Sequence, residues 1–334
     1  MNFPAMQYQS LADDLPSVSR LSLGSWNTFS RCSSEQLEAL LARAFERGIN
    51  LLDVGYYWDK PDTEDAVAAA LRGLAAPRDS YTIAQKLWLW DYPEHSFAEQ
   101  LGRSLQRLGS DHVDIVMVSR PTADLALEPF IGEVVALVEA GMARAWGVTN
   151  FTPEQLRDTL ALVNQRNWPH PVLLQVQYNV MRRGVVEGPG YAELFAEGAI
   201  RLCAANMLEG GILAGHLERD RVNPPEFAEG KRPVHRNICR DSGGIRELIR
   251  ERQPRLREIA RDFGASPAQL ALAFGLSHPH LGTALVGVTE PDHVDENVAA
   301  LALLDCATEI RAAVDELAIE GVAHPKLFNP HNGI

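Results

Sequence analysis

The sequence predicts a closed (β/α)8 TIM barrel of the α/β class, with a short N-terminal hairpin before it and a long loop after its seventh strand. Eight short apolar runs, typical of buried parallel strands, recur at a spacing of roughly 30 residues, and helical patterns follow them. An open doubly wound sheet is the alternative, but it would need a GxGxxG motif where the first run ends in Gly24-Ser25-Trp26. We therefore expect residues 1–334 to form a single domain.

The first repeat follows the expected hairpin, which covers residues 8 to 18. The first barrel strand is expected over residues 20–24, and Ser33 or Ser34 can cap the helix that comes next. Gly48 can end this helix in a left-handed turn. Its apolar residues fall on one stripe, which faces the strands: Leu37, Leu40, Leu41, Ala44 and Phe45.

The later strands share one property, which is a polar or small residue where the strand meets the following loop. The second strand ends near Asp53, before a helix over residues 64–71. The other strands end near Lys86, Ser119, Asn150, Gln175 and Ala205, and the last covers residues 283–287. Helical patterns lie at 95–108, 125–140, 153–164 and 266–277. Because the carboxyl ends of barrel strands meet at one mouth, these polar side chains are expected to face a common site.

Asp53 is the most informative of these residues, because a short buried strand would not otherwise carry an acid. A strand-end pair of Asp53 and Lys86 is equally well explained as a structural ion pair or as a catalytic one. A buried lysine beside a carboxylate can, however, shift a nearby phenol toward a neutral pKa by its positive charge. Tyr57 lies in the loop after Asp53 and could supply that phenol.

Composition excludes several classes of partner. The net charge of −13 and the pI near 5.2 argue against nucleic acid and against an anionic membrane surface. The cysteines are few and widely spaced, which predicts reduced thiols in a cytoplasmic protein and no metal site: Cys32, Cys203, Cys239 and Cys306. We expect neither a membrane span nor a targeting signal, because the chain has no long apolar run and no basic N-terminal region before one.

Two loop regions suggest ligands. Residues 214 to 244 concentrate positive charge in an acidic chain: Arg219, Arg221, Lys231, Arg232, His235, Arg236 and Arg240. This loop is either a solvated insertion or a lid over phosphates, and the sequence leaves both open. An aromatic-walled substrate pocket is predicted by the aromatic residues of the first three strand-to-helix loops, although each could instead pack in the core: Trp26, Trp58, Trp88, Trp90 and Tyr92.

The chain resembles the aldo-keto reductase family over almost its whole length. The resemblance rests on the Asp53 segment, on Lys86 and on these motifs: Val113-Asp114-Ile115-Val116-Met117-Val118, Gly147-Val148-Thr149-Asn150-Phe151 (family GxSNF), Gln175-Val176-Gln177-Tyr178-Asn179 (family QxxYN), Leu208 to Gly215, and Gly287 followed by Glu296-Asn297 (family PG…EN). It implies a barrel that binds NADP or NAD across its mouth. It also implies that carbonyls are reduced by hydride transfer with a Tyr, Lys, His, Asp tetrad.

The resemblance also implies which residues bind the cofactor. Thr149, Asn150 and Gln175 correspond to the clamp on the nicotinamide carboxamide. The other implied cofactor-binding residues are Asn206, Leu208, Gly210, Gly287, Thr289, His293, Glu296 and Asn297. Thr289 and His293 stand where many members carry a basic residue for the adenosine 2′-phosphate, and Glu290 is acidic, so NADP and NAD both stay open.

The catalytic positions depart from the family pattern. Counted from Asp53, the family tyrosine falls on Trp58, whose indole cannot donate a proton as a phenol does. Tyr57, one residue earlier, could substitute if the loop takes a different path. The family histidine is replaced by Ser119, which can orient a carbonyl but does not titrate near neutral pH. The tyrosine that stacks on the nicotinamide is replaced by Ala205.

Three hypotheses of function follow. The first is an NAD(P)-dependent oxidoreductase of the aldo-keto reductase type that acts on a small ring-like or sugar-like carbonyl or hydroxyl compound. Its proton relay would be atypical, with Lys86 as the acid or sharing a proton with Tyr57, and with Ser119 holding the carbonyl oxygen. The second is a non-redox lyase, dehydratase or isomerase, and the third is a regulatory protein that binds cofactor without turnover. The sequence does not predict an oligomeric state.

Overall fold

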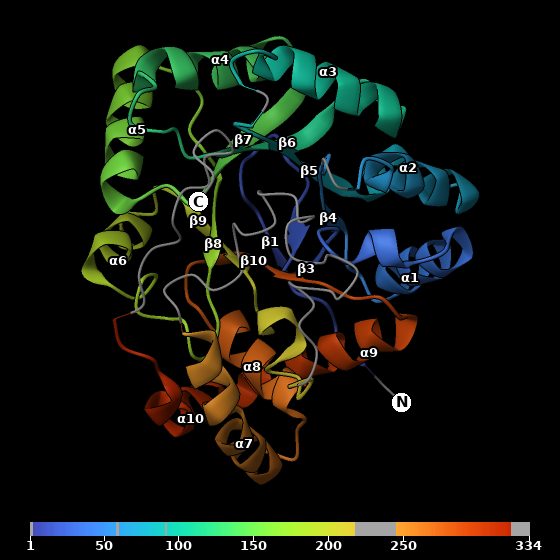
Figure 1. Cartoon of the computed structure of the whole chain (residues 1–334), viewed down its shortest axis with the longest axis vertical. Coiled ribbons are helices and arrows are strands. Elements are labelled where there is room, and N and C mark those ends of the chain that lie inside the picture. The colour runs from blue at the N-terminus through green and yellow to red at the C-terminus, as the bar shows by residue number, and fades with distance from the viewer. Residues whose placement is uncertain (1–2, 58–59, 91, 218–244, 322–334) are drawn as a thin grey trace, which may run out of the picture.

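Eight parallel strands close into a barrel in the order β10-β3-β4-β5-β6-β7-β8-β9, and helices surround them (Figure 1). The computed structural model describes residues 3–57, 60–90, 92–217 and 245–321. The predicted (β/α)8 barrel is therefore confirmed. The N-terminal hairpin is also present, as β1 (Tyr8–Gln9) paired antiparallel with β2 (Val18–Ser19).

The barrel strands lie where the sequence predicts them. They are β3 (Leu21–Gly24), β4 (Leu51–Val54), β5 (Thr82–Leu87), β6 (Val113–Ser119), β7 (Ala143–Thr149), β8 (Leu173–Gln177), β9 (Arg201–Ala205) and β10 (Leu281–Val286). Their pairing aligns the carboxyl ends, with Thr149 beside both Ser119 and Gln175 in the register. Polar residues that are far apart in the chain thus reach the same mouth.

The helices that cover the barrel are α1 (Ser34–Glu46), α2 (Thr63–Gly73), α3 (Phe97–Leu108), α4 (Leu127–Glu139), α5 (Pro153–Arg166), α6 (Pro189–Ala196), α7 (Arg246–Asp262), α8 (Pro267–Leu276), α9 (Pro291–Ala299) and α10 (Ala307–Ala313). Short 3-10 helices are η1 (Phe29–Arg31), η2 (Arg78–Ser80), η3 (Glu209–Gly211), η5 (Ala300–Cys306) and η6 (Asp315–Leu317). Ser33 caps α1 in a capping box with Gln36, and Gly48 has a φ of +79° just after it, as expected. Within the described chain, no helix combines the length and the apolarity needed to cross a bilayer.

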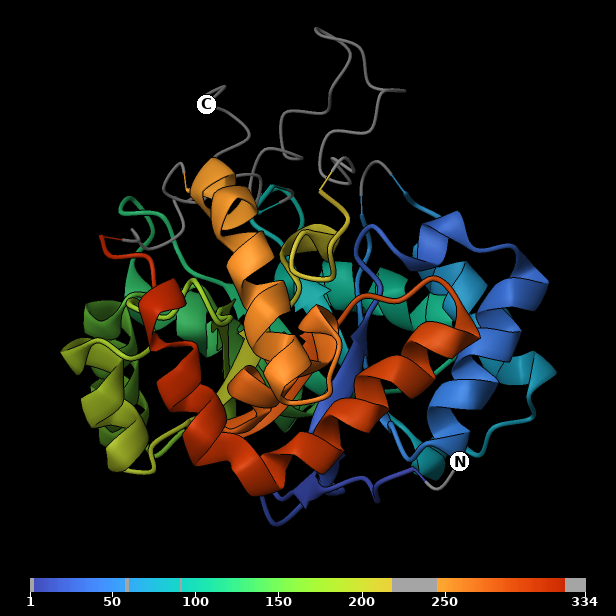
Figure 2. The ribbon, with the colours of Figure 1, turned by 90° about the horizontal axis from the view of Figure 1, so that it is seen from below.

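The hydrophobic core has an outer and an inner part. The outer part lies between strands and helices and includes the fully buried Trp146 and Phe130. The inner part fills the barrel and is formed by Leu15, Val18, Leu51, Ala84, Ile115, Met117, Ala145, Leu173, Cys203 and Leu285. Leu15 and Val18 come from the hairpin, which closes the face opposite to the segment after β9 (Figure 2). The packed interior leaves the mouth as the place where a site can form.

Candidate active site

A chain of hydrogen bonds crosses the carboxyl ends of four barrel strands. Lys86 Nζ on β5 donates to Asp53 Oδ2 on β4 over 2.6 Å. Gln175 Nε2 on β8 donates to the same oxygen over 2.7 Å, and Thr149 Oγ1 on β7 donates to Gln175 Oε1 over 3.2 Å. Asp53, Lys86 and Gln175 are 5%, 8% and 5% exposed. The structure thus brings together four of the predicted site residues, whose roles stay predictions.

The Lys86–Asp53 ion pair is buried, which limits what each partner can do. Removing one member of such a pair lowers the free energy of unfolding by about 3–5 kcal/mol, because the remaining charge stays buried without a partner. Asp53 already accepts two hydrogen bonds through one oxygen, so it is suited to hold Lys86 in place. An ammonium has three N–H donors, and the bond to Asp53 uses one of them. Lys86 can therefore still donate to a hydroxyl or a carbonyl oxygen.

Tyr57 places a phenol in the loop that follows Asp53. Its side chain is 3% exposed, and its hydroxyl lies 3.0 Å from Ser25 Oγ. Gly55 lies between Tyr57 and Lys86: a Cβ there would lie 3.4 Å from Tyr57 Cζ and 3.2 Å from Lys86 Cβ. Trp58, which the sequence puts at the family tyrosine position, lies outside the described residues. The substitution of Tyr57 for the family tyrosine therefore stays a prediction, supported by its place beside Lys86.

The tryptophans on the loop after β5 form one wall. The rings of Trp88 and Trp90 stack with centroids 4.1 Å apart, and Trp88 lies 6.0 Å from the Tyr57 ring. Trp88 Nε1 donates to the Tyr56 carbonyl oxygen over 2.8 Å, which joins this wall to the loop that carries Tyr57. Trp26 is half-buried in the loop after β3. Two of the predicted wall residues are thus in contact with each other.

The predicted polar residues at the other strand ends occupy the mouth. Ser119 is half-buried at the end of β6, beside Thr149 in the register. Asn150 follows β7 with a φ of +58°, and its backbone N–H donates to the Gln175 backbone carbonyl oxygen over 2.9 Å. The turn at Asn150 redirects the chain just beyond the strand. Its position therefore suits a contact with a ligand that lies across the mouth.

The predicted cofactor-binding residues beyond β9 and β10 fall into two segments. Asn206, Leu208 and Gly210 lie on the segment that follows β9, where Gly210 has a φ of +65°. Gly287 and Thr289 follow β10, and the rest are on α9, namely His293, Glu296 and Asn297. Within the described residues, the Nδ2 group of Asn297 has no hydrogen-bond acceptor, although the side chain is only 4% exposed. Glu296 accepts a hydrogen bond from Ser266 Oγ over 2.9 Å.

The surroundings of Thr289 bear on the choice between NADP and NAD. Cys32 Sγ lies 3.7 Å from the Thr289 carbonyl oxygen. Burial raises the pKa of this thiol, and the carboxylate of Glu290 raises it further, so Glu290 is close to the same place. A carboxylate there would disfavour a second anion such as a 2′-phosphate.

A model of the Aldo/keto reductase family matches residues 20–319 of this chain. The chain belongs to the aldo-keto reductase family. It is 27% identical over 329 residues to the "Probable voltage-gated potassium channel subunit beta" of Oryza sativa subsp. japonica, in an alignment that covers 96% of this chain and 98% of that one. A relative of the same name from Arabidopsis thaliana is 24% identical over 314 residues, covering 91% and 94%.

Solved aldo-keto reductases share the fold. A thermostable aldo-keto reductase in complex with the inhibitor epalrestat matches with a TM-score of 0.71 at 24% identity, covering 93% of this chain and 100% of the other. An aldo-keto reductase from Klebsiella pneumoniae in complex with NADPH matches with a TM-score of 0.71 at 22% identity, covering 98% and 100%. At such identities the likeness to these structures extends to the fold.

Cys203 is a residue at the site that sequence reasoning missed. It is on β9, beside Gln175 in the register, and is 3% exposed. Burial raises the pKa of its thiol to about 12; Asp53 adds to this, while Lys86 and a hydrogen bond with Gln175 oppose it. The thiol is therefore neutral and unreactive near pH 7, and it forms the floor of the site. Strand alternation could have revealed it, because Cys203 shares a face with Ala205 at the mouth.

A buried network around Glu64 was also missed. Glu64 is fully buried, accepts hydrogen bonds from Gln85 Nε2 over 2.6 Å and Ser104 Oγ over 2.8 Å, and pairs with Arg107. The Arg107 guanidinium lies 4.7 Å from the centre of the Tyr56 ring. One carboxylate therefore links α2, β5 and α3 to the loop of Tyr57. In the sequence, residue 64 was used only as the start of the predicted helix over 64–71.

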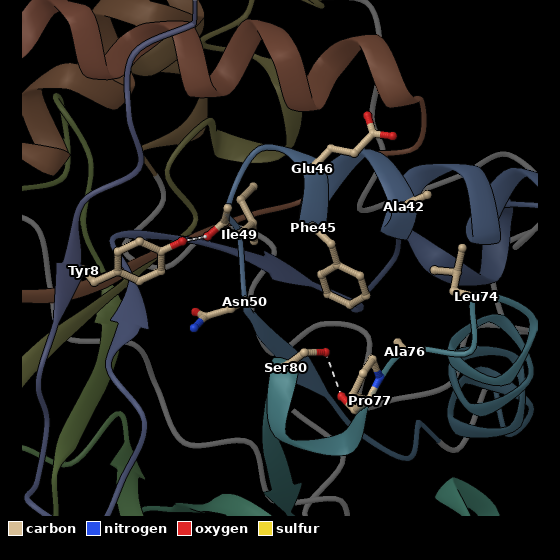
Figure 3. A pocket seen from close by; sticks show the side chains of 11 residues that line it. Tyr8, Ala42, Phe45, Glu46, Ile49, Asn50, Leu74, Ala76, Pro77 and Ser80 are labelled. Carbon is tan, nitrogen blue, oxygen red and sulfur yellow. Dashed lines mark hydrogen bonds between the residues drawn. The ribbon is translucent and has the colours of Figure 1, made fainter.

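A hollow of about 490 Å³ lies at the opposite face of the barrel, among residues of the hairpin, α1 and the end of α2 (Figure 3). Its lining residues are Tyr8, Ala42, Phe45, Glu46, Gly48, Ile49, Asn50, Leu74, Ala76, Pro77 and Ser80. The Tyr8 hydroxyl donates to the Gly48 carbonyl oxygen over 2.8 Å, and the Ser80 hydroxyl donates to that of Pro77 over 2.6 Å. Because its polar rim is already engaged and Asp53 is at the other face, the hollow is separate from the candidate site.

Proposed function

We propose that this chain is an NAD(P)H-dependent oxidoreductase that reduces a small carbonyl compound with a ring-like or sugar-like part, or oxidises the corresponding alcohol. The observation that carries the proposal is the buried Lys86–Asp53 pair at the mouth, joined to Gln175 and in contact with the loop of Tyr57. The aromatic wall of Trp88 and Trp90 supports a planar or ring-shaped substrate.

The residues at the mouth fit a nicotinamide dinucleotide. Asn297 carries a buried amide group without an acceptor in the described chain, which suits a nucleobase acceptor. The amides of Asn150 and Gln175 lie at strand ends where they can hold a carboxamide. Membership of the family and the NADPH complex of the Klebsiella pneumoniae protein also support this cofactor class. A bound reduced nicotinamide would supply the hydride.

The protein's own residues would supply the proton. In this proposal the Tyr57 hydroxyl donates a proton to the carbonyl oxygen, and the positive charge of Lys86 stabilises the phenolate that remains. Asp53 keeps the ammonium in place, and the Ser119 hydroxyl donates to the same carbonyl oxygen from the end of β6. If Tyr57 does not reach the substrate, Lys86 is the remaining acid. One hydride and one proton together complete the reduction of a carbonyl to an alcohol.

The proposal is tested first by nucleotide binding and then by turnover of carbonyl compounds. Calorimetric titration of the purified protein with NADPH and with NADH should give saturable binding to at least one of them. A panel of aromatic and sugar-derived aldehydes and ketones should then be screened for loss of the reduced-nicotinamide absorbance. Ser80→Ala, in the separate hollow, serves as the control variant and should behave like the wild type. A protein that binds neither NADPH nor NADH would rule out the proposed reaction.

A non-redox lyase, dehydratase or isomerase is a second candidate, favoured by the absence of the family histidine at Ser119 and of the stacking tyrosine at Ala205. Product formation without any change in cofactor absorbance would identify it.

A regulatory protein that binds cofactor without turnover is the third candidate. It is favoured by the relatives named as channel subunits, and binding without turnover on any substrate of the panel would support it.

We also propose that the protein works in the cytoplasm. The cysteines that the structure describes, Cys32, Cys203 and Cys306, are free thiols, as expected in a reducing compartment. Cys239 lies outside the described residues, as does most of the basic loop, residues 218–244. The interpretation of that loop as a lid therefore stays a prediction from its charge.

A further inference from the structure

The segment after β9, residues 206–215, is held by a buried carboxylate. Glu209 is 2% exposed and accepts two hydrogen bonds from Arg182, which is also 2% exposed: Nε donates to Oε2 and Nη2 to Oε1, each over 3.0 Å. Asn179 Nδ2 and Asn206 Nδ2 donate to Oε2 over 3.0 and 2.9 Å. Four hydrogen bonds thus converge on one side chain of a loop at the barrel mouth.

The backbone of this segment is unusual for a glutamate. Glu209 has a φ of +49°, in the left-handed region that glycine adopts freely and other residues adopt rarely. Asn206, Gly210, Gly211 and Gly215 also have positive φ values, of 60°, 65°, 103° and 97°. A glycine at 209 would relieve the local strain but would remove the carboxylate that holds the segment. The backbone N–H groups of Glu209 and Gly211 donate to carbonyl oxygens of the segment itself, whereas those of Leu208 and Gly210 have no acceptor among the described residues and can donate to an anion.

We propose that Arg182 and Glu209 are positioning residues for the dinucleotide pyrophosphate. This inference rests on the proposed cofactor binding, in which Leu208 and Gly210 contact the nucleotide. Glu209 fixes the backbone of residues 206–215, and Arg182 neutralises the carboxylate that does so. Without Arg182, a buried negative charge would lie on the same short segment as the incoming phosphates and would repel them.

The proposal predicts an order of affinities that a purely structural pair would not produce. Arg182→Met leaves the Glu209 carboxylate buried without its cation, so it should weaken binding of NADPH or NADH by about tenfold or more. Adding Glu209→Gln to this variant removes the charge and should restore part of the affinity.

Arg183→Met is the matched control. Arg183 is the next residue, is 6% exposed, and donates to the Val314 carbonyl oxygen and pairs with Asp315, away from the segment. The melting temperature of every variant is measured beside its dissociation constant, well below the unfolding transition. If Arg182→Met does not fold, Glu209→Gln and Arg182→Lys replace it, since lysine keeps the charge but loses the two-point contact. Both should then bind the nucleotide more weakly than the wild type.

The outcomes separate this inference from the proposed function. A wild type that binds nucleotide, with Arg182→Met no weaker than Arg183→Met, overturns the positioning role and leaves the oxidoreductase proposal intact. A double variant as weak as Arg182→Met overturns the electrostatic role. In the replacement set, Glu209→Gln and Arg182→Lys with wild-type affinity also overturn it. A wild type that binds neither NADPH nor NADH overturns both proposals.

Discussion

Lys86 donates one hydrogen bond to Asp53, which holds the ammonium in place, and its other N–H donors remain for a ligand. If it assists proton transfer, Lys86→Met should lower turnover by about two to four orders of magnitude while nucleotide affinity stays nearly unchanged. Steady-state kinetics on an accepted carbonyl compound and calorimetry with the nucleotide measure the two quantities. Wild-type turnover in this variant would mean that the inherited ion pair has no part in the chemistry.

The variant Tyr57→Phe tests which residue donates the proton. Tyr57→Phe removes the hydroxyl that lies 3.0 Å from Ser25 Oγ but keeps the ring against Trp88. If the phenol is the acid, turnover should fall as far as in Lys86→Met, by about two to four orders of magnitude. Tyr56→Phe is the control, since the described contacts of Tyr56 use its ring and its carbonyl oxygen. Wild-type turnover in both Tyr57→Phe and Tyr56→Phe would leave Lys86 as the proton donor.

At the scale of the elements, the turn after β7 should contribute directly to cofactor affinity. Asn150 follows the strand in a left-handed conformation that asparagine tolerates better than most residues. Asn150→Ala should weaken nucleotide binding by about 1–3 kcal/mol through loss of buried hydrogen bonds to the carboxamide. Calorimetry with Asn150→Asp as a second variant, which keeps the conformation but not the amide donor, separates the hydrogen bond from the turn. Unchanged affinity in both would remove Asn150 from the cofactor site.

The strands could be predicted because each is a short buried run with a helix after it, and parallel strands share their carboxyl end. Asp53, Lys86 and Gln175 were therefore found at one mouth without knowledge of the structure. Pairings between loops could not be predicted in this way. Arg182 and Glu209 are on loops after different strands, and no period connects them. Helix α7 was not predicted either, and it contains Pro254, which argues against a helix on local grounds.

At the scale of the whole molecule, His278 is a buried titratable group that connects stability with pH. It is 7% exposed in the turn between α8 and β10. Its ring packs edge-on against Tyr178 and Phe195, with centroids 5.3 and 5.7 Å away. Burial lowers its pKa to about 4, and the charges of Arg311, His280 and Arg20 act in the same direction.

This histidine should make the folded state less stable in acid. An unfolded chain protonates histidine near pH 6.5, whereas the folded protein keeps His278 neutral until about pH 4. Between these values the unfolded state binds more protons, so stability is lost as the pH falls, by up to about 3 kcal/mol. Denaturant unfolding measured from neutral pH down to about pH 4.5 tests this.

The control for this prediction is His278→Asn. Asparagine does not titrate but keeps an acceptor for the His280 amide, which bonds to His278 Nδ1 over 3.3 Å. Its free energy of unfolding should therefore change less with pH than that of the wild type. Parallel curves for the two proteins would show that carboxylates elsewhere cause the acid sensitivity.

The hairpin that closes the barrel has a consequence for hydration. Leu15 and Val18 pack on the same inner cluster as Cys203, and Cys203 is the floor beneath Lys86 and Asp53. Among the described residues, this cluster closes the inner side of the ion pair, and a substrate at the mouth would displace water from the outer side. A few apolar atoms near the N-terminus thus help to set the local dielectric in which a proton would move at the other end of the barrel.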